Sequence, residues 1–184
     1  MDRGAAAYRR FLEGDDKGIE ELIAEYKDGL ILYLAGFCGG LDTAEELMED
    51  VFVKLVVDRP AYKGKSSFKT WLFAIAGNIA RDYIRKNRRA RFSSLEELGE
   101  LSSPESDLLR DHFRSEEKLL VRKCLDKLNP QYKQVLYLVF FEEFSNAEAA
   151  KIMKKSVRQI ENLLYRAKKS LETQLREEGF DYEK

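Results

Sequence analysis

Apolar residues recur every three or four positions along almost the whole chain, which is the spacing of an amphipathic α-helix. One clear apolar face runs from Ile19 to Phe37, and the pair Gly39-Gly40 is expected to end that helix. The segment Asp42–Glu45 has the form of a capping box and predicts the start of a second helix. The residues that this helix is expected to bury are Ala44, Leu47, Val51 and Leu55. No segment alternates convincingly as a strand would, so the pattern predicts an all-α fold.

A third helix is predicted within residues 63–91, where Ser66 and Ser67 can cap its start. Its expected buried stripe comprises Phe68, Leu72, Ile75 and Ile79. The segment holds nine basic residues and one acid, which suits phosphate binding because Lys and Arg displace the counterions of nucleic acids. Aromatic and small polar residues near its start suit contacts to unpaired bases. From these residues alone, a solvated basic helix is an equally good interpretation.

Charge is segregated along the chain, although the formal net charge is only −1. The second predicted helix carries five acids within nine residues: Asp42, Glu45, Glu46, Glu49 and Asp50. Capping needs fewer acids, and the segment alone favours a solubilising face over a docking surface for a basic partner. Residues 92–117 hold eight acids and two bases, and Ser, Gly and Pro interrupt any long period. This composition predicts a linker over about 92–112, with a short helical turn near Leu95–Leu98.

A second compact unit is predicted to begin near Ser115, and its first helix is marked by Leu119, Leu120, Cys124 and Leu128. Asn129-Pro130 predicts the start of the next helix, which is very apolar through about Glu143 and is expected to be central to the core. Two capping boxes, beginning at Ser145 and Ser156, then start a short helix and a long one. A short helix, a tight turn and a longer helix form a helix-turn-helix layout.

The long C-terminal helix has two distinct faces. Its apolar face comprises Ile160, Leu164, Ala167, Leu171 and Leu175. The opposite face carries Arg158, Gln159, Asn162, Arg166 and Lys169. These side chain types contact guanine, adenine and phosphate in the major groove of duplex DNA. An ordinary amphipathic helix is the less favoured interpretation, because the cap spacing and both faces agree.

The residues offer little for catalysis. Cys38 and Cys124 lie far apart in apolar patterns and are expected to be reduced core residues of a cytosolic protein. His112 is the single histidine, no Cys/His cluster has metal-ligand spacing, and no Gly-rich loop follows a strand. No apolar run is long enough to span a bilayer, and the N-terminus lacks the apolar core of a signal peptide. We therefore predict no catalytic residue, metal or cofactor, no membrane insertion and a cytoplasmic location.

Three segments together resemble one protein family. Residues 66–89, SSFKTWLFAIAGNIARDYIRKNRR, resemble the promoter-melting helix of extracytoplasmic-function (ECF) sigma factors, which also reads the −10 element. Residues 42–55, DTAEELMEDVFVKL, resemble the helix before it, and residues 128–175 resemble the C-terminal domain of the family. The resemblance implies two small helical domains joined by a flexible linker. Domain 2 would occupy residues 1–91, the acidic linker 92–114, and the helix-turn-helix domain 4 residues 115–184.

The resemblance also implies a function: a dissociable promoter-specificity subunit of bacterial RNA polymerase, which directs the core enzyme to −35 and −10 elements and opens the DNA. Its partners would be core polymerase, promoter DNA and an anti-sigma protein. Positions matching the core-docking surface are Glu45, Glu46, Glu49, Asp50 and Phe52. Positions matching the −10 and single-strand surface are Lys63, Lys65, Ser66, Ser67, Phe68, Trp71, Asn78, Arg81, Arg85, Lys86 and Arg88. The −35 surface would be Arg158, Gln159, Asn162, Arg166 and Lys169.

The chain departs from the family pattern at two positions. Lys154 stands where the helix-turn-helix turn commonly has Gly, so Lys154 is expected to adopt a left-handed backbone or the turn differs. Glu161 stands where a basic residue is common and is left out of the DNA-binding set. Trp71 fits either the core or the strand-lining surface. Two other functions remain open, a stand-alone helix-turn-helix regulator that binds operator DNA and a helical adaptor, although both leave the basic segment 63–91 without a role.

Overall fold

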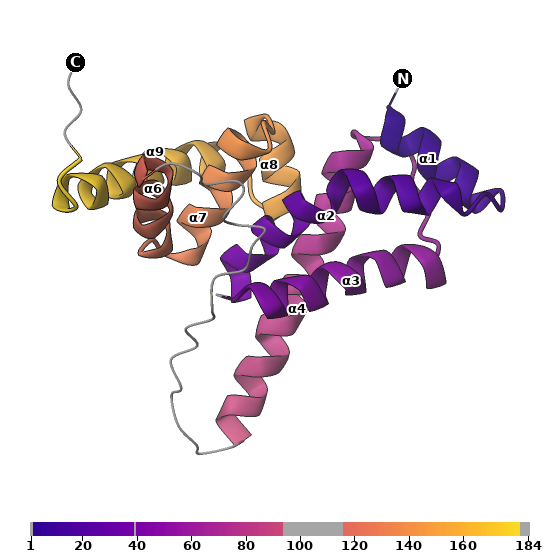
Figure 1. Ribbon diagram of the computed structural model, residues 1–184, viewed down its shortest axis with the longest axis horizontal. Coiled ribbons are helices and arrows are strands. Elements are labelled where there is room, and N and C mark those ends of the chain that lie inside the picture. Colours follow the sequence, from indigo (N-terminus) through magenta and orange to yellow (C-terminus); the bar gives the residue numbers. More distant parts are fainter. Residues whose placement is uncertain (1, 39, 94–115, 181–184) are drawn as a thin grey trace. The chain divides into compact units, whose positions relative to one another are not determined.

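The computed structural model describes residues 2–38, 40–93 and 116–180, and every regular element in these ranges is a helix (Figure 1). The chain divides into two compact units, one of Met1–Ser103 with Lys151–Lys154 and one of Pro104–Ala150 with Lys155–Lys184. The all-α prediction is confirmed. Most of the predicted linker, including the turn near Leu95–Leu98, lies outside the described residues, as does His112. The functional domain boundaries therefore stay a prediction.

Unit 1 is built around α2 (Lys17–Cys38), which packs against α1 (Arg3–Leu12), α3 (Leu41–Val57) and α4 (Phe68–Ser93). The predicted apolar face of α2 supplies much of the core, through Leu22, Tyr26, Leu30 and Leu34. Ile23 was grouped with that face but is 37% exposed. The expected buried set of α3 is confirmed, since Ala44, Leu47, Val51 and Leu55 are all buried.

Helix α1 was not predicted, because its large apolar residues are only Tyr8, Phe11 and Leu12, in a short basic segment. Leu12 is exposed, whereas Tyr8 and Phe11 are buried. The side chain of Asp2 caps the helix by accepting from the Ala5 amide. The backbones of α1 and α2 approach closely: a Cβ on Gly18 would lie 2.3 Å from the carbonyl oxygen of Ala7. The absence of a side chain at Gly18 therefore lets the two helices pack.

The start of α3 differs from the prediction. The helix begins at Leu41, Gly40 is the N-cap, and no side chain caps it, so the capping box expected at Asp42 is wrong. Leu41 is buried, which explains why the chain is already helical there. Its side chain can reach the core only if the helix begins one residue before Asp42.

Helix α4 begins as expected at the serine pair. The hydroxyl of Ser67 accepts from the Thr70 amide at 3.2 Å, which is an N-cap hydrogen bond. The buried stripe is rotated from the predicted one: Ile75 and Ile79 are only half-buried. The apolar residues of α4 that are fully buried include Phe68, Leu72, Phe73, Ala76 and Ala80.

Unit 2 comprises α6 (Glu116–Asp126), α7 (Pro130–Leu136), the π-helical turn η1 (Tyr137–Phe141), α9 (Val157–Glu177) and the part of α8 (Asn146–Met153) that ends at Ala150. Asn129 caps α7 by accepting from the Tyr132 amide, and Pro130 is its first residue, as predicted. The continuation of α7 is wrong in part. The chain leaves the α-helix at η1, which exposes Phe140 by 52% and Phe141 by 41% instead of burying them.

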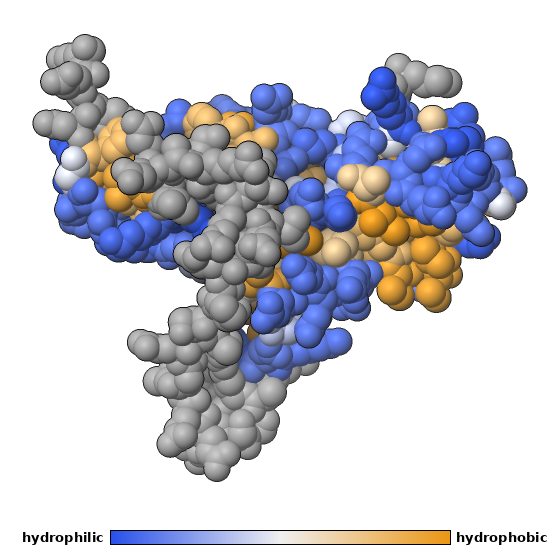
Figure 2. Space-filling model, in the orientation of Figure 1, coloured by the Kyte–Doolittle hydropathy of each residue, from blue (hydrophilic) through white to orange (hydrophobic). Residues whose placement is uncertain are grey.

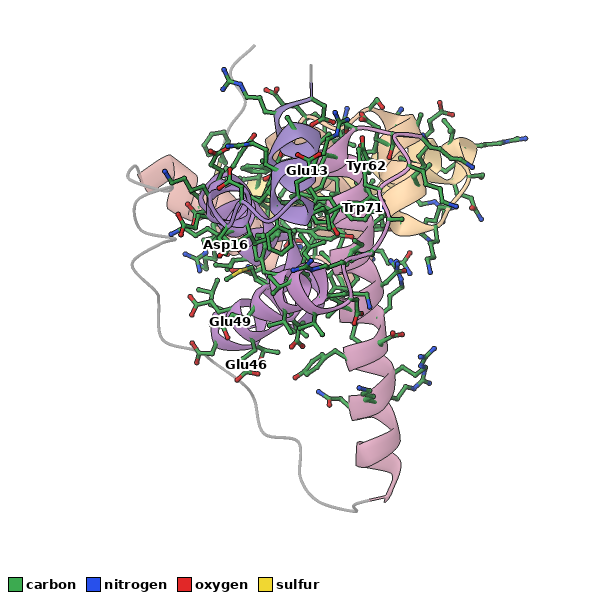
Figure 3. All side chains as sticks on the ribbon, turned by 90° about the vertical axis from the view of Figure 1, so that its right-hand side faces the viewer. Glu13, Asp16, Glu46, Glu49, Tyr62 and Trp71 are labelled. Atoms are coloured by element: carbon green, nitrogen blue, oxygen red, sulfur yellow. The ribbon has the colours of Figure 1, made fainter. Side chains whose placement is uncertain are left out.

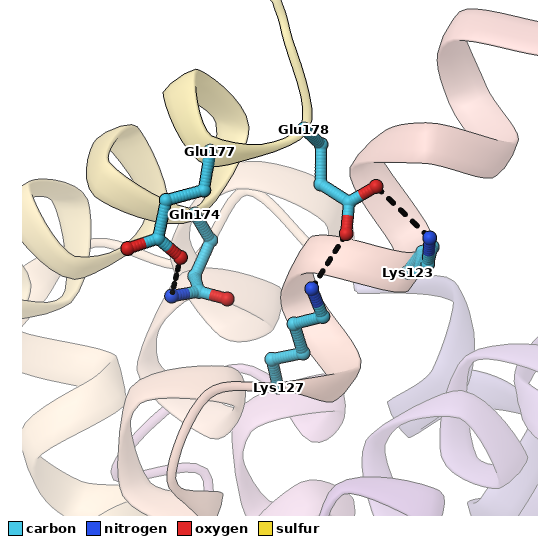
Figure 4. Close-up of polar contacts among 5 residues, drawn as sticks. All are labelled: Lys123, Lys127, Gln174, Glu177 and Glu178. Atoms are coloured by element: carbon cyan, nitrogen blue, oxygen red, sulfur yellow. Dashed lines mark hydrogen bonds and ion pairs between the residues drawn. The ribbon is translucent and has the colours of Figure 1, made fainter.

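The end of α9 is tied to α6 by an ion-pair cluster (Figure 4). The Glu178 carboxylate accepts from Lys127 Nζ at 2.5 Å and from Lys123 Nζ at 2.9 Å. These two hydrogen bonds lower the pKa of Glu178 to about 2. Cys124 of α6 is a buried free thiol as predicted, whereas Cys38 is only half-buried. Burial raises the pKa of both thiols.

Candidate functional site

The exposed face of α3 changes from acidic to apolar along the helix. Glu46, Glu49 and Asp50 are exposed, and Figure 3 shows Glu46 and Glu49 pointing outward from α3. Glu45 is half-buried at the edge of this face. Phe52 is only 5% exposed and lies in the core, so it has little surface to offer a partner and its docking role stays a prediction. Successive residues of an α-helix are rotated by about 100°, so Phe52 can face the core while its neighbour Val53 faces outward.

Three valines continue the acidic face toward the C-terminus of α3, and the sequence analysis missed them. Val53 is 56%, Val56 42% and Val57 71% exposed, and Figure 2 shows hydrophobic surface where α3 ends. Val53 and Val57 lie three and seven residues after Asp50, and Val56 lies seven residues after Glu49, so the valines share the side of the helix that carries these acids. The sequence signal that could have revealed them is a valine at three positions on the side of the helix that also carries the acids. We define the α3 face as Glu46, Glu49, Asp50, Val53, Val56 and Val57.

The loop between α3 and α4 carries the basic and small polar residues predicted to meet single-stranded DNA. Lys63, Lys65 and Ser67 are exposed, and Ser66 is half-buried. Gly64 has φ +67°, a left-handed conformation that favours glycine. The Tyr62 hydroxyl donates to the carbonyl oxygen of Ser66 and closes the loop on itself. We call residues 60–67 the α4 loop.

Phe68 is the clearest correction at this surface. Its side chain is 0% exposed and packs among the rings of Tyr8, Tyr26, Tyr62 and Trp71. A ring enclosed on all sides cannot stack on a base, so we remove Phe68 from the DNA-binding set. The ring centroid of Trp71 lies 5.3 Å from those of Phe68 and Tyr62. Trp71 is only half-buried, so part of its side chain remains accessible.

Farther along α4, polar side chains are exposed in a row. The Asn78 amide oxygen accepts from an Arg81 guanidinium nitrogen at 2.9 Å, and both side chains are half-buried. Arg85 forms an exposed ion pair with Asp82 at 3.0 Å. Lys86 and Arg88 are exposed. The described part of α4 thus presents Arg81, Arg85, Lys86 and Arg88 outside the core, where they can meet phosphates.

The turn between α8 and α9 contains the left-handed residue that was expected at Lys154. Lys154 has φ +55°, and the Lys155 amide donates to the carbonyl oxygen of Ala150 at 2.9 Å. This six-to-one bond is that of a Schellman motif, so Lys154 does adopt the left-handed backbone expected in place of Gly. Capping boxes are present before both helices, at Ser145 and at Ser156.

The two faces of α9 are as predicted except at one position. Ile160, Leu164, Ala167 and Leu175 are buried, whereas Leu171 is only half-buried. The opposite face is exposed at Arg158, Gln159, Asn162, Arg166 and Lys169. Gln159 has a second task, because its Oε1 accepts from the Ser156 amide at 2.8 Å in the capping box. Its NH₂ group remains as the donor that could meet a base.

Two family patterns match the segments that carry these surfaces. The pattern of "Sigma-70 region 2" matches residues 22–90, and that of "Sigma-70, region 4" matches residues 118–171. The chain is 30% identical to RNA polymerase sigma factor YlaC of Bacillus subtilis over 164 residues, which is 87% of this chain and 95% of that protein. The chain belongs to the ECF RNA polymerase sigma factors.

Two further sigma factors are similar to this chain, one in sequence and one in fold. The chain is 24% identical to the ECF factor SigW of B. subtilis, covering 90% of this chain and 92% of that protein. The fold matches the sigma factor RpoE of Bartonella quintana, solved with its anti-sigma factor NepR, with a TM-score of 0.72 and 21% identity. That match covers 87% of this chain and 98% of RpoE. This sigma factor is therefore a promoter-specificity subunit of RNA polymerase and not an enzyme, and its partners are core polymerase and promoter DNA.

In residues 2–38, 40–93 and 116–180, no group of three or more His, Cys, Asp or Glu side chains is placed to hold a metal ion. Over the same described part of the sigma factor, no helix is both long and apolar enough to cross a membrane.

Proposed function

We propose that this sigma factor divides its work among three surfaces: the α3 face docks on core polymerase, the α4 loop and helix hold the melted −10 strand, and α9 reads the −35 duplex. The observation that carries this proposal is the charge of the exposed helix faces. The α3 face is acidic, whereas the exposed residues of the α4 loop, α4 and α9 are mainly basic. An acidic face suits a basic protein partner, and basic faces suit DNA.

Docking on core polymerase would combine charge with apolar contact. Glu46, Glu49 and Asp50 would pair with basic side chains of the partner, and Val53 and Val57 would lose their exposed area to it. Burying such valines stabilises a complex through the hydrophobic effect, at roughly 25 cal/mol per Å² of apolar surface. Rim charges chiefly fix orientation and association rate.

The docking proposal is tested by charge reversal. An exposed ion pair is typically worth up to about 1 kcal/mol. Glu46→Lys with Glu49→Lys should therefore weaken the affinity for core polymerase by roughly tenfold or more. The matched control is Glu20→Lys with Asp28→Lys, the same charge change at exposed positions of α2. Equal affinities of the two double variants in a fluorescence titration would contradict docking through the α3 face.

Strand capture would use the loop and the side of α4 that stays outside the core. Lys63, Lys65, Ser66 and Ser67 can bond phosphates and base edges, Trp71 can stack with its exposed part, and Asn78 can hydrogen-bond a base. Arg81, Arg85, Lys86 and Arg88 would hold phosphates of the strand and of the upstream duplex. Lys65→Ala with Ser66→Ala should spare duplex binding and reduce permanganate reactivity of promoter thymines. Unchanged reactivity would contradict the assignment.

Duplex recognition would rest on α9. Arg158, Asn162 and Arg166 are exposed opposite the buried face, so their removal should leave the fold intact. Loss of a bidentate base contact costs about 1–3 kcal/mol and relaxes specificity at that base. Gln159 and Lys169 would add a base donor and a phosphate contact. Holoenzyme carrying Asn162→Ala should discriminate less between −35 variants, and unaltered discrimination would contradict base readout at that position.

Two further points belong to the proposal. The protein would act in the cytoplasm, where RNA polymerase transcribes the chromosome. An anti-sigma protein would hold it inactive, which rests on family membership and is tested by co-purification from its own cells.

A further inference from the structure

Helix α1 and the residue before it hold both ends of the α4 loop, at Pro60 and at Phe68, which directly follows the loop. At the far end, the Asp2 carboxylate accepts from the amide of Phe68, the first residue of α4, at 2.6 Å through Oδ2. The other oxygen, Oδ1, accepts from the Ala5 amide at 3.1 Å. One side chain therefore caps the N-termini of two helices, and Asp2 and Phe68 lie 66 residues apart in the sequence.

At the near end, the Tyr8 hydroxyl donates to the carbonyl oxygen of Pro60 at 2.9 Å. The Tyr8 ring is 1% exposed and lies 5.5 Å, centroid to centroid, from each of the rings of Phe68 and Trp71. Gly4 completes the contact, because a Cβ there would lie 2.5 Å from Phe68 Cδ1. Helix α1 thus fits closely against the first turn of α4.

These contacts fix the ends of a segment that has no helix of its own. Ordering a flexible backbone costs about 1–2 kcal/mol per residue, and a loop that is ordered before binding does not pay that cost when its ligand arrives. We infer that Asp2 and Tyr8 are positioning residues for strand capture: they hold the α4 loop, through its Pro60 and Phe68 ends, in the conformation that receives the melted strand. This inference rests on the proposed role of the α4 loop.

Asp2→Asn is the sharpest variant. Asparagine remains a good N-cap, but its NH₂ group replaces one of the two carboxylate oxygens, so in this geometry a donor would face either the Ala5 amide or the Phe68 amide. Tyr8→Phe is the second variant, which removes only the hydroxyl bonded to Pro60. The matched control is Glu13→Gln, which removes one negative charge from an exposed residue at the opposite end of α1.

The experiment has two measurements on the full-length protein. In the free protein, amide hydrogen exchange of residues 61–70 should rise roughly three- to tenfold in Asp2→Asn and Tyr8→Phe, as expected for the loss of one hydrogen bond. In the holoenzyme, the lifetime of the open complex should fall by a similar factor on intact and on pre-melted templates. Core affinity should not change, and Glu13→Gln should match the wild type in every assay.

Three results would overturn the inference, and they can be told apart. Unchanged amide hydrogen exchange at residues 61–70 would show that Asp2 and Tyr8 do not hold the α4 loop. Faster exchange throughout unit 1 would show that Asp2 stabilises the fold without positioning the loop. If Lys65→Ala with Ser66→Ala shortens the open-complex lifetime and the Asp2 and Tyr8 variants do not, the α4 loop captures the strand without help from α1. If the loop variant has no effect either, the proposed role of the loop itself has failed.

Discussion

Replacing Phe68 by alanine should damage the fold of unit 1 and not a DNA contact. The ring is fully buried, and its centroid lies 5.3 Å from that of Trp71, 5.5 Å from those of Tyr8 and Tyr62 and 6.0 Å from that of Tyr26. Truncation of a buried Phe to Ala typically costs about 3–5 kcal/mol of unfolding free energy. Small domains have about 5–15 kcal/mol in total, so this loss would leave a large unfolded fraction under mild denaturation.

The chain supplies its own probe for this measurement. Trp71 is the single tryptophan, it belongs to unit 1, and its ring contacts that of Phe68. Urea unfolding followed by Trp71 fluorescence therefore reports on this unit. Phe68→Leu keeps an apolar side chain and should cost less than Phe68→Ala. Val57→Ala, at a 71% exposed position of the same unit, should change the unfolding free energy by less than about 0.5 kcal/mol.

A loss of less than about 1 kcal/mol in Phe68→Ala, together with defective promoter opening, would refute the reasoning. It would mean that the ring leaves the core and meets the strand. With the expected large loss, an opening defect of the alanine variant reports unfolding, and the α4 loop must be tested through Lys65 and Ser66 instead.

Three other predictions concern the turn between α8 and α9, the cap of α9 and the ion pairs of Glu178. Lys154→Gly should raise the unfolding free energy by about 0.5–1 kcal/mol in thermal melts, because a left-handed backbone disfavours lysine and suits glycine, and an unchanged melting temperature would contradict this. Ser156→Ala should cost about 1 kcal/mol, because the Gln159 amide loses the Ser156 hydroxyl as its acceptor, with urea titration by circular dichroism as the measurement. Glu178 has a lowered pKa, so its pairs with Lys123 and Lys127 stabilise the protein above the unfolded-state pKa of about 4.3 and lose that effect as pH falls toward 2. Glu178→Gln should therefore melt at a lower temperature than the wild type at pH 7, and this difference should shrink between about pH 4.5 and 2. A difference independent of pH would contradict it.

Local signals that depend on neighbouring residues predicted most of the helix caps. The caps at Ser67, Asn129, Ser145 and Ser156 form, because a side chain oxygen and an amide three residues later need no distant partner, whereas the cap expected at Asp42 does not. The left-handed Lys154 was expected from the resemblance, because Lys154 stands where the turn of the family commonly has Gly. Resemblance to the sigma factors supplied the architecture and the function.

Features decided by distant packing could not be predicted in the same way. Phe52 and Phe68 are apolar residues within surfaces that the family uses, and only the packed structure shows that both are buried. Phe140 lies in a run that reads as core, but the π-helical turn η1 rotates it toward solvent. Helix α1 has few large apolar residues, and its attachment through Asp2 to Phe68 crosses most of unit 1 in sequence. No local pattern signals such a contact.

The most direct test of the account is transcription in vitro with purified bacterial core RNA polymerase on a library of promoter sequences. We expect the protein alone to bind duplex promoter DNA poorly and core polymerase alone to initiate without specificity. Together they should initiate from a subset of templates that share −35 and −10 elements, with permanganate-reactive thymines at the −10 element. Tight binding of the isolated protein to duplex DNA, with no promoter-specific initiation when core polymerase is added, would contradict the account.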